Sequence, residues 1–190
     1  DSGASINAGA GNIVMNGRGQ NASTAGNYGI YVYGGTAQAI GTGTVTLNGI
    51  GGGVTNSGSN MGIYIAGAGM VSAVDGTLSV TGTGGGAGAG VNSHGIYFSN
   101  SSSTLTTTGT GNIIIIGVGG NLAGSGDVNY GVYANVANSI KASGGGSITV
   151  TGVKGGQANS YGIVVNSGSG VTASGTGNVT LLTDTLSFGT

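Results

Sequence analysis

The sequence predicts an all-β fold, a parallel β-helix with three short strands in each coil. Three observations predict this fold class: a motif that recurs about every 33 residues, short runs of alternating apolar residues, and glycines at regular places between the runs. A near-constant period of this size is typical of solenoids and other repeat arrays. One coil cannot bury its own apolar face, so we expect neighbouring coils to stack around a continuous core.

The recurring motif is a glycine followed by alternating apolar and aromatic residues. Its glycines stand 33, 33, 36 and 31 positions apart, and we expect each one to begin the first strand of a coil. These five first strands cover about residues 30–32, 63–65, 96–98, 132–134 and 163–165.

Two more apolar runs complete each period. In the third strand of one coil, Val45 and Leu47 share one face while Thr46 lies on the other, as alternation in a strand requires. The predicted second strands are 6–8, 37–39, 71–73, 105–107, 140–142 and 171–173, and the third strands are 13–15, 45–47, 78–80, 113–115, 148–150 and 179–181.

The second strands predict two inward columns, one of larger apolar residues and one of small residues that lets a narrow coil close. The larger residues are Ile6, Ala37, Val71, Leu105, Ile140 and Val171, and the small ones are Ala8, Ala39, Ala73, Thr107, Ala142 and Ala173.

Glycines separate the strands of each coil. A glycine such as Gly43 stands between the second and third strands of every coil, where we expect a corner with positive φ. Another, such as Gly49, is expected to end the third strand. About ten residues rich in Gly, Ser and Asn then lead to the next coil, and their variable length marks the place where the fold tolerates insertion.

Residues 1–190 are expected to form a single β-solenoid domain of about five coils, with partial coils at both ends. The chain is expected to begin within a second strand and to end just after a third strand, near Leu186. Because open β edges favour pairing with another chain, we expect either a segment of a longer polypeptide or a subunit that stacks end to end.

The composition excludes some classes of function. Only 4% of the residues are charged and the net charge is -1, which gives no electrostatic footprint for binding nucleic acid. No apolar run approaches the ~18 residues of a membrane-spanning helix. The absence of Cys fits a bacterial protein that folds outside the cell, although it is also compatible with other compartments.

The first strands carry the candidate functional residues, which are Tyr31, Tyr64, Tyr97 and Tyr133. If the neighbouring Ile and Val residues face inward, these rings form an outward ladder with one ring per coil. Three interpretations are open: the rings stack and stiffen the sheet, they bind a second copy of the chain, or they bind the faces of sugars.

No catalytic constellation, metal site or cofactor site is predicted. His94 is the only histidine, and it replaces a tyrosine or methionine in a column with an expected structural role. The acids Asp1, Asp75, Asp127 and Asp184 fall in different coils and corners, so no pair is placed for acid–base work on a glycosidic bond. The bases Arg18, Lys141 and Lys154 are scattered as well, and we expect that the chain is not an enzyme.

The Gly-Ile-Tyr strands, Thr-Gly corners and Gly-rich loops, from about Ser5 to Leu182, resemble the β-helical passenger regions of bacterial autotransporters and filamentous-haemagglutinin-type surface proteins. The resemblance implies a right-handed β-helix at the bacterial cell surface or outside the cell. It also implies export through an outer-membrane β-barrel that lies outside this chain, and a role as an adhesin, spacer or matrix filament.

The expected function is therefore that of an extracellular structural or adhesive rod. Such a rod would be a filament subunit or a stalk segment that associates with itself through its open β ends and its tyrosine-bearing face. The alternatives are a glycan-binding adhesin module and, less favoured, a β-helical enzyme that degrades polysaccharides.

Overall fold

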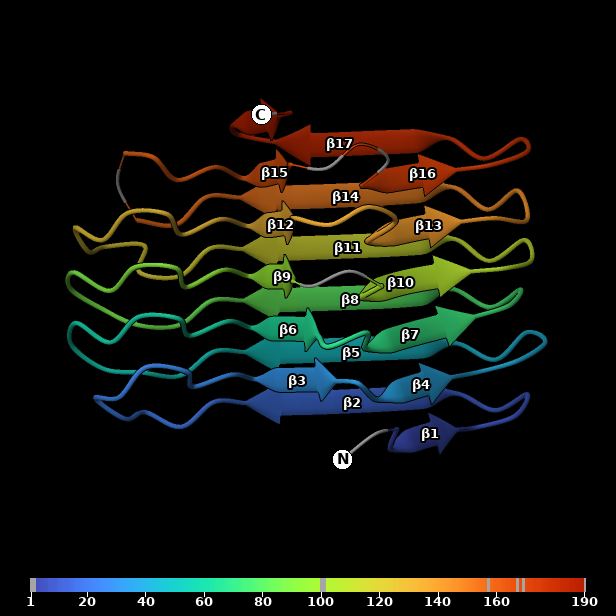
Figure 1. Cartoon of the computed structure of the whole chain (residues 1–190), viewed down its shortest axis with the longest axis horizontal. Coiled ribbons are helices and arrows are strands. Elements are labelled where there is room, and N and C mark those ends of the chain that lie inside the picture. Colours follow the sequence, from blue (N-terminus) through green and yellow to red (C-terminus); the bar gives the residue numbers. More distant parts are fainter. Residues whose placement is uncertain (1–2, 100–101, 157, 167, 169, 190) are drawn as a thin grey trace.

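The computed structural model describes residues 3–99, 102–156, 158–166, 168 and 170–189. These residues form eighteen strands and no helix (Figure 1). The strands belong to three parallel six-stranded sheets, in which each strand pairs with its equivalents one coil before and one coil after. The predicted all-β solenoid with three strands per coil is thus confirmed.

The three sheets correspond to the three predicted runs. The first sheet contains β3 (Ile30–Tyr33), β6 (Ile63–Ala66), β9 (Ile96–Phe98), β12 (Val132–Ala134), β15 (Ile163–Val165) and β18 (Leu186–Phe188). The second contains β1 (Ser5–Asn7), β4 (Thr36–Gln38), β7 (Met70–Ala73), β10 (Thr104–Thr107), β13 (Ile140–Ala142) and β16 (Val171–Ala173). The third contains β2 (Ile13–Arg18), β5 (Val45–Ile50), β8 (Leu78–Thr83), β11 (Ile113–Val118), β14 (Ile148–Val153) and β17 (Val179–Thr183).

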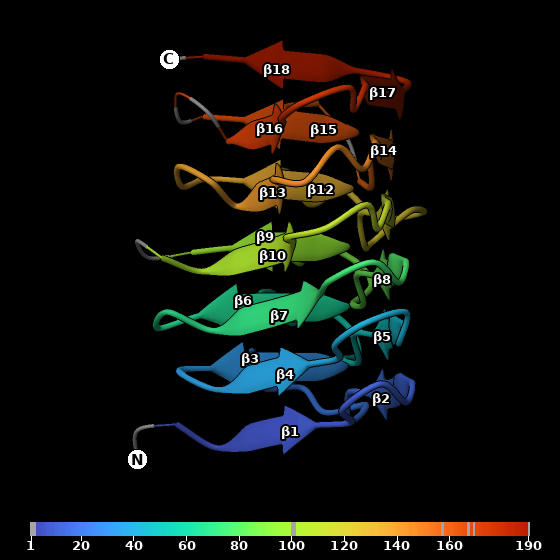
Figure 2. The same ribbon diagram turned by 90° about the vertical axis from the view of Figure 1, so that its right-hand side faces the viewer.

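The coil winds to the right. In Figure 1 the first and second sheets run left to right in front, the third sheet runs right to left behind them, and the chain climbs from the N- to the C-terminus. Figure 2, seen from the side, places the third sheet opposite the other two. Parallel strands joined by crossovers favour this hand. The longest axis of the molecule lies across the coils, so each coil is wider than the stack is tall.

The core lies between the three sheets and follows the predicted alternation. Leu47, Ile63, Phe98 and Leu105 are completely buried, and they come from all three sheets. The predicted second-strand columns also face inward, although Ile6 is half exposed because β1 is the edge strand of its sheet among the described residues. Burial of these equivalent positions holds every strand to one register.

The third strands are longer than predicted, because five of them, β2, β5, β8, β11 and β14, continue through the glycine instead of ending there. Gly49 lies inside β5. A Cβ on Gly49 would lie 2.2 Å from the carbonyl oxygen of Gly62, which belongs to the next first-strand motif. Only glycine permits the third strand to pass so close to the first.

Glycines occur at the corners as predicted, but the predicted reason for them, a positive φ, is wrong. Gly43 does not have a positive φ, which occurs instead at Gly41 (φ 55°). A Cβ on Gly43 would lie 2.4 Å from the carbonyl oxygen of Gly11, its equivalent one coil earlier. These glycines therefore serve the close stacking of the corners.

The last strand, β18, was missed in the sequence. It pairs with β15 and adds a sixth strand to the first sheet. It has no Gly-Ile-Tyr motif, and only Asp184 and Thr185 separate it from β17. The long connection that precedes the other first strands is absent here, and Gly162 bonds to Thr185 only 23 residues later. We call each long connection, on the left in Figure 1, a lobe.

Candidate functional site

Four tyrosines on the first sheet stack on one another along the coil axis. Tyr31, Tyr64, Tyr97 and Tyr133 lie on β3, β6, β9 and β12, and the parallel register places each ring beside the next. Neighbouring ring centroids are 5.0, 5.3 and 4.9 Å apart, with interplanar angles of 11°, 1° and 12°. Stacked rings at such distances stabilise each other. This tyrosine ladder ends where Tyr133 pairs with Val164.

Strand alternation places the ladder on the outer side of the sheet. Ile63 and Ile65, on either side of Tyr64, are completely buried, whereas Tyr64 is partly exposed. Exposure is greatest at the first ring, where 49% of Tyr31 is exposed. The outer part of the ladder is therefore accessible, and its accessible aromatic surface is concentrated at Tyr31 and the neighbouring Tyr33.

Side chains of the following coil bind the ladder hydroxyls. The Tyr64 hydroxyl lies 2.8 Å from Ser99 Oγ, and Asn166 Nδ2 donates to the Tyr133 hydroxyl at 2.9 Å. Both partners stand two positions after the ladder position of their own coil. The hydroxyls thus tie successive coils together, which is the behaviour expected of rings that stiffen the sheet.

Tyr97 shows how the ladder environment acts on ionisation. Burial raises its pKa because the phenolate is poorly hydrated, and the neighbouring Tyr133 and Tyr64 raise it further. Hydrogen bonds from Asn135 and Ser99 act in the opposite direction, but burial is the larger effect and the pKa stays above its usual value. The hydroxyl is neutral at physiological pH.

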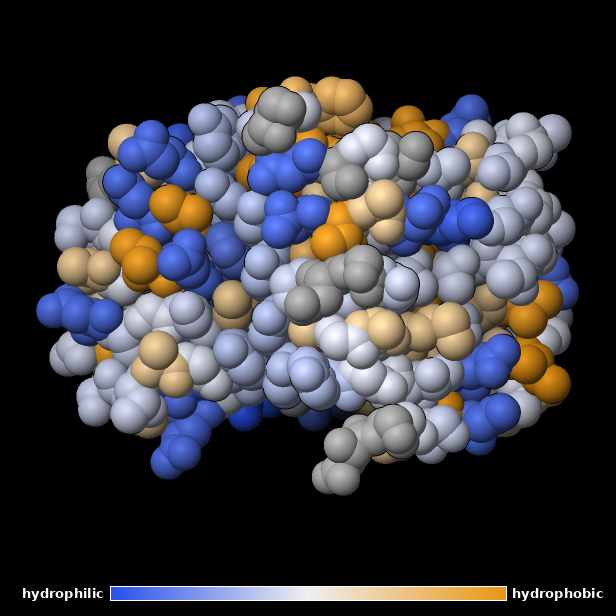
Figure 3. All heavy atoms as spheres, in the orientation of Figure 1, coloured by the Kyte–Doolittle hydropathy of each residue, from blue (hydrophilic) through white to orange (hydrophobic). Residues whose placement is uncertain are grey.

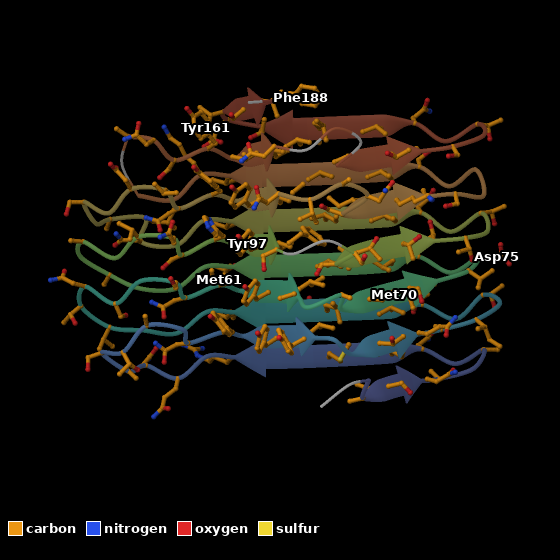
Figure 4. All side chains as sticks on the ribbon, in the orientation of Figure 1. Met61, Met70, Asp75, Tyr97, Tyr161 and Phe188 are labelled. Carbon is orange, nitrogen blue, oxygen red and sulfur yellow. The ribbon has the colours of Figure 1, made fainter. Side chains whose placement is uncertain are left out.

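A second column packs against the ladder from the position just before each motif glycine. Tyr28, for example, has its ring centroid 5.2 Å from that of Tyr31 and 5.1 Å from that of Tyr64. Figure 4 shows Met61 and Tyr161 of this column on the same side of the coils as Tyr97 of the ladder. The column consists of Tyr28, Met61, His94, Tyr130 and Tyr161, and together with the ladder it forms what we call the aromatic face.

His94 is the most deeply placed ionisable group of the aromatic face, with only 2% of its surface exposed. Its ring stacks on Tyr130 at a centroid distance of 5.0 Å. Its Nδ1 atom accepts a hydrogen bond from the backbone N–H of Tyr130 at 3.1 Å, so this nitrogen carries no proton. Burial lowers the pKa of His94 to about 3, and the imidazole is neutral.

A column of Asn and Ser residues beneath the aromatic face was not recognised from the sequence. Each member after Asn27 accepts a hydrogen bond from the backbone N–H of its equivalent one coil earlier. Asn60 accepts from Asn27 at 3.1 Å, and Ser93 accepts from Asn60 at 3.3 Å. Asn129 then accepts from Ser93 at 2.8 Å, and Ser160 accepts from Asn129 at 3.1 Å.

The asparagines of this column also hold the lobes. Asn129 Nδ2 donates to the carbonyl oxygens of Gly126 at 2.8 Å and Gly90 at 3.2 Å, which lie in two successive lobes. Asn129 is completely buried, so its amide satisfies backbone groups that water cannot reach. The signal in the sequence was an Asn or Ser two positions before every motif glycine.

The described acids bond to different residues, and Asp184 lies beside Gly162, the motif glycine that follows Tyr161 of the aromatic face. Asp75 lies at the opposite corner of the coil (Figure 4) and accepts from the backbone N–H of Thr110 in the next coil at 2.9 Å. Asp127 accepts from Asn159, and Asp184 accepts from the backbone N–H of Lys154. Each of these acids thus bonds to a neighbouring coil. Asp1 lies outside the described residues.

Metal ligands do not gather in the described part of the chain, where no three His, Cys, Asp or Glu side chains are grouped to hold an ion. An open hollow of about 700 Å³ lies over the second sheet and contains a single cation, Lys141, among hydroxyl and amide groups. Figure 3 shows this side of the molecule with hydrophobic and hydrophilic residues scattered over it. The hollow is lined by Ser102, Thr104, Thr106, Asn135, Val136, Ala137, Asn138 and Lys141.

Comparisons with protein-family models, with curated proteins and with solved structures found no match for this chain. The described residues include no helix that could cross a membrane.

Proposed function

We propose that the chain is a structural rod, a stalk segment or filament subunit whose work is mechanical. The observation that supports this proposal is that the backbone hydrogen bonds of three parallel sheets continue from each coil to the next. Stacked tyrosines and the Asn and Ser column reinforce the same coil-to-coil direction. A solenoid of this kind holds its ends at a fixed separation, because each coil is fixed by its neighbours.

Single-molecule force measurements test the mechanical role. The chain is held between two handles at its termini and extended. We expect resistance followed by stepwise release of coil-sized lengths of about 33 residues. Smooth extension at low force, with no steps, would contradict a load-bearing role.

The proposal also places the rod at the bacterial surface or outside the cell, where it associates with itself through its open β ends and its tyrosine-bearing face. The location rests on the resemblance to bacterial surface proteins. Electron microscopy of the purified chain over a concentration series tests association. Ordered fibres support a filament subunit, whereas isolated short bodies at every concentration favour a segment of a stalk.

Glycan binding is a second candidate function, and one observation favours it. Tyr31 and Tyr33 expose 49% and 62% of their surfaces, and their ring centroids lie 5.6 Å apart. Exposed aromatic rings of this kind can bind the apolar faces of sugars. A glycan array probed with the chain and with the Tyr31→Ser/Tyr33→Ser variant tests this role. Glycan binding that survives the double substitution would exclude these rings as the binding site.

We propose no enzymatic activity. The described acids belong to different coils and each bonds to a neighbouring coil, which supports structural roles for them. Incubation with a panel of acidic and neutral polysaccharides, followed by assay of reducing ends, tests this proposal, and release of oligosaccharides would overturn it.

A further inference from the structure

The outer face of the third sheet differs from the aromatic face, because it is broad and nearly uncharged. Each of β2, β5, β8, β11 and β14 presents three outward residues, and β17 presents two. On the four central strands all outward residues are apolar, hydroxyl-bearing or, at Asn48, an amide. The one charged outward residue within these six strands is Arg18 on β2. The strands stack with little twist, so the face is flat (Figures 1 and 2).

The centre of this face is an apolar ridge. Ile114 and Ile116 on β11 expose 41% and 42% of their surfaces, although a strand with one solvated side normally turns polar residues outward. Shorter Ser and Thr side chains flank the ridge, since Ser79 and Thr81 pair with these isoleucines from β8. A trough of hydroxyl groups thus lies beside a ridge of isoleucine.

We infer that this face binds the same face of a second copy of the chain, with two-fold symmetry. An axis along the strands between β8 and β11 would place the ridge of each copy in the trough of the other, so the surface is complementary to itself. No like charges on the central strands oppose the contact. The inference rests on the proposed structural role, and it adds the outer face of the third sheet to the open β ends and the tyrosine-bearing face as a surface of self-association.

The area of the face is sufficient for such a contact. A strand spacing of about 4.8 Å and a two-residue repeat of about 6.6 Å give roughly 32 Å² per outward position and roughly 550 Å² for the whole face. Two such faces, treated as flat, together bury about 1,100 Å², and protruding side chains add to this area. The sum exceeds the about 1,000 Å² expected of a specific interface. The pair is therefore a weak, concentration-dependent dimer.

Sedimentation of the purified chain over a concentration series tests the inference. The test variant is Ile114→Lys/Ile116→Lys, which places two charges on the ridge. The matched control is Ile40→Lys/Leu122→Lys, which adds the same charge at residues that are 45% and 62% exposed outside the third sheet. We expect dimers of the chain and of the control, and at least about a tenfold weaker dimer for the test variant. Circular dichroism confirms that each variant is folded.

A second readout reports the position of the contact. Because the chain contains no Cys, a single Ile116→Cys substitution introduces a unique thiol. A short bis-maleimide should link two copies through Ile116→Cys but not through Leu122→Cys. Monomers at every concentration, or dimers that persist in the folded lysine variant, would overturn the inference. Neither result would affect the stepwise force response of a single chain, which tests the rod itself.

Discussion

The imidazole of His94 accepts a hydrogen bond from the backbone of Tyr130 in the next coil, at 3.1 Å. Protonation of Nδ1 would break this bond and place a charge among the rings of Tyr97, Tyr130 and Tyr133. His94 therefore couples the stability of the stack to pH.

We predict that the protein loses stability as the pH falls below about 6.5. The pKa of His94 is about 3 in the fold and 6.5 in the unfolded chain, so the unfolded chain takes up a proton first. The free energy of unfolding should fall by about 2 kcal/mol between pH 7.5 and pH 5. Urea titrations at both pH values measure the change. His94→Met, which copies Met61 of the preceding coil, should lose most of this pH dependence, and an unchanged slope in that variant would refute the assignment.

The hydroxyl of Tyr133 is predicted to stabilise the fold, whereas that of Tyr31 is not. Tyr133 bonds to Asn166, but the equivalent position in the coil after Tyr31 is Ala66. Tyr133→Phe should cost about 1 kcal/mol and Tyr31→Phe close to nothing, because only the first change breaks a hydrogen bond. Chemical denaturation of both variants measures the difference. Equal losses would indicate that the hydroxyl contacts do not matter.

Gly49 is predicted to be irreplaceable inside its strand. A Cβ there would meet the carbonyl oxygen of Gly62 at 2.2 Å, and neither backbone can move without opening the corner between two sheets. Gly49→Ala should lower stability by at least about 3 kcal/mol or prevent folding. The control is Gly168→Ala, where an added Cβ meets nothing within 4 Å. Thermal unfolding of the two variants compares them, and a stable Gly49→Ala protein would contradict the stated close approach.

The buried amide of Asn129 provides a test of the polar column. Asn129→Ala leaves the backbone N–H of Ser93 without its acceptor and removes a donor from the carbonyl oxygen of Gly126, while that of Gly90 keeps the hydrogen bond from Asn121. We expect a loss of about 3 kcal/mol, because buried unpaired groups are costly. Asn129→Ser should recover part of this loss, since serine occupies the same column at Ser160. Hydrogen exchange at the Ser93 amide reports the effect directly, and protection equal to the original in the alanine variant would argue against the column.

The period and the alternation were enough to predict the architecture, because each depends only on local pattern. Val45 and Leu47 face inward because of the alternation from which this was predicted, and so do the equivalent residues of the other coils. β18 escaped prediction because it has no motif glycine and follows a two-residue turn. The patterns show that glycines recur, but only the stacked coils show that Gly43 meets Gly11 and that Gly49 meets Gly62.

The candidate site was predicted in part. The positions of the four ladder tyrosines on one outward line followed from alternation, but the binding roles given to them stay predictions. The hydrogen bonds that engage Tyr64 and Tyr133 join residues 35 and 33 positions apart. The buried acceptors Asn60 and Asn129 likewise act on the neighbouring coil. The partner of each of these side chains depends on how the coils align along the coil axis, and no local sequence pattern gives this alignment.

The connection between β17 and β18 has a consequence for how such a chain can change. There the coil closes with two residues, and Gly162 bonds to Thr185 where the other coils carry a lobe. The strands of a coil and its lobe are thus separable, and the lobe can be lengthened, shortened or exchanged while the strands are kept. A foreign peptide grafted into a chosen lobe would project from one side of the stack, and the number of coils between two grafts would set their spacing.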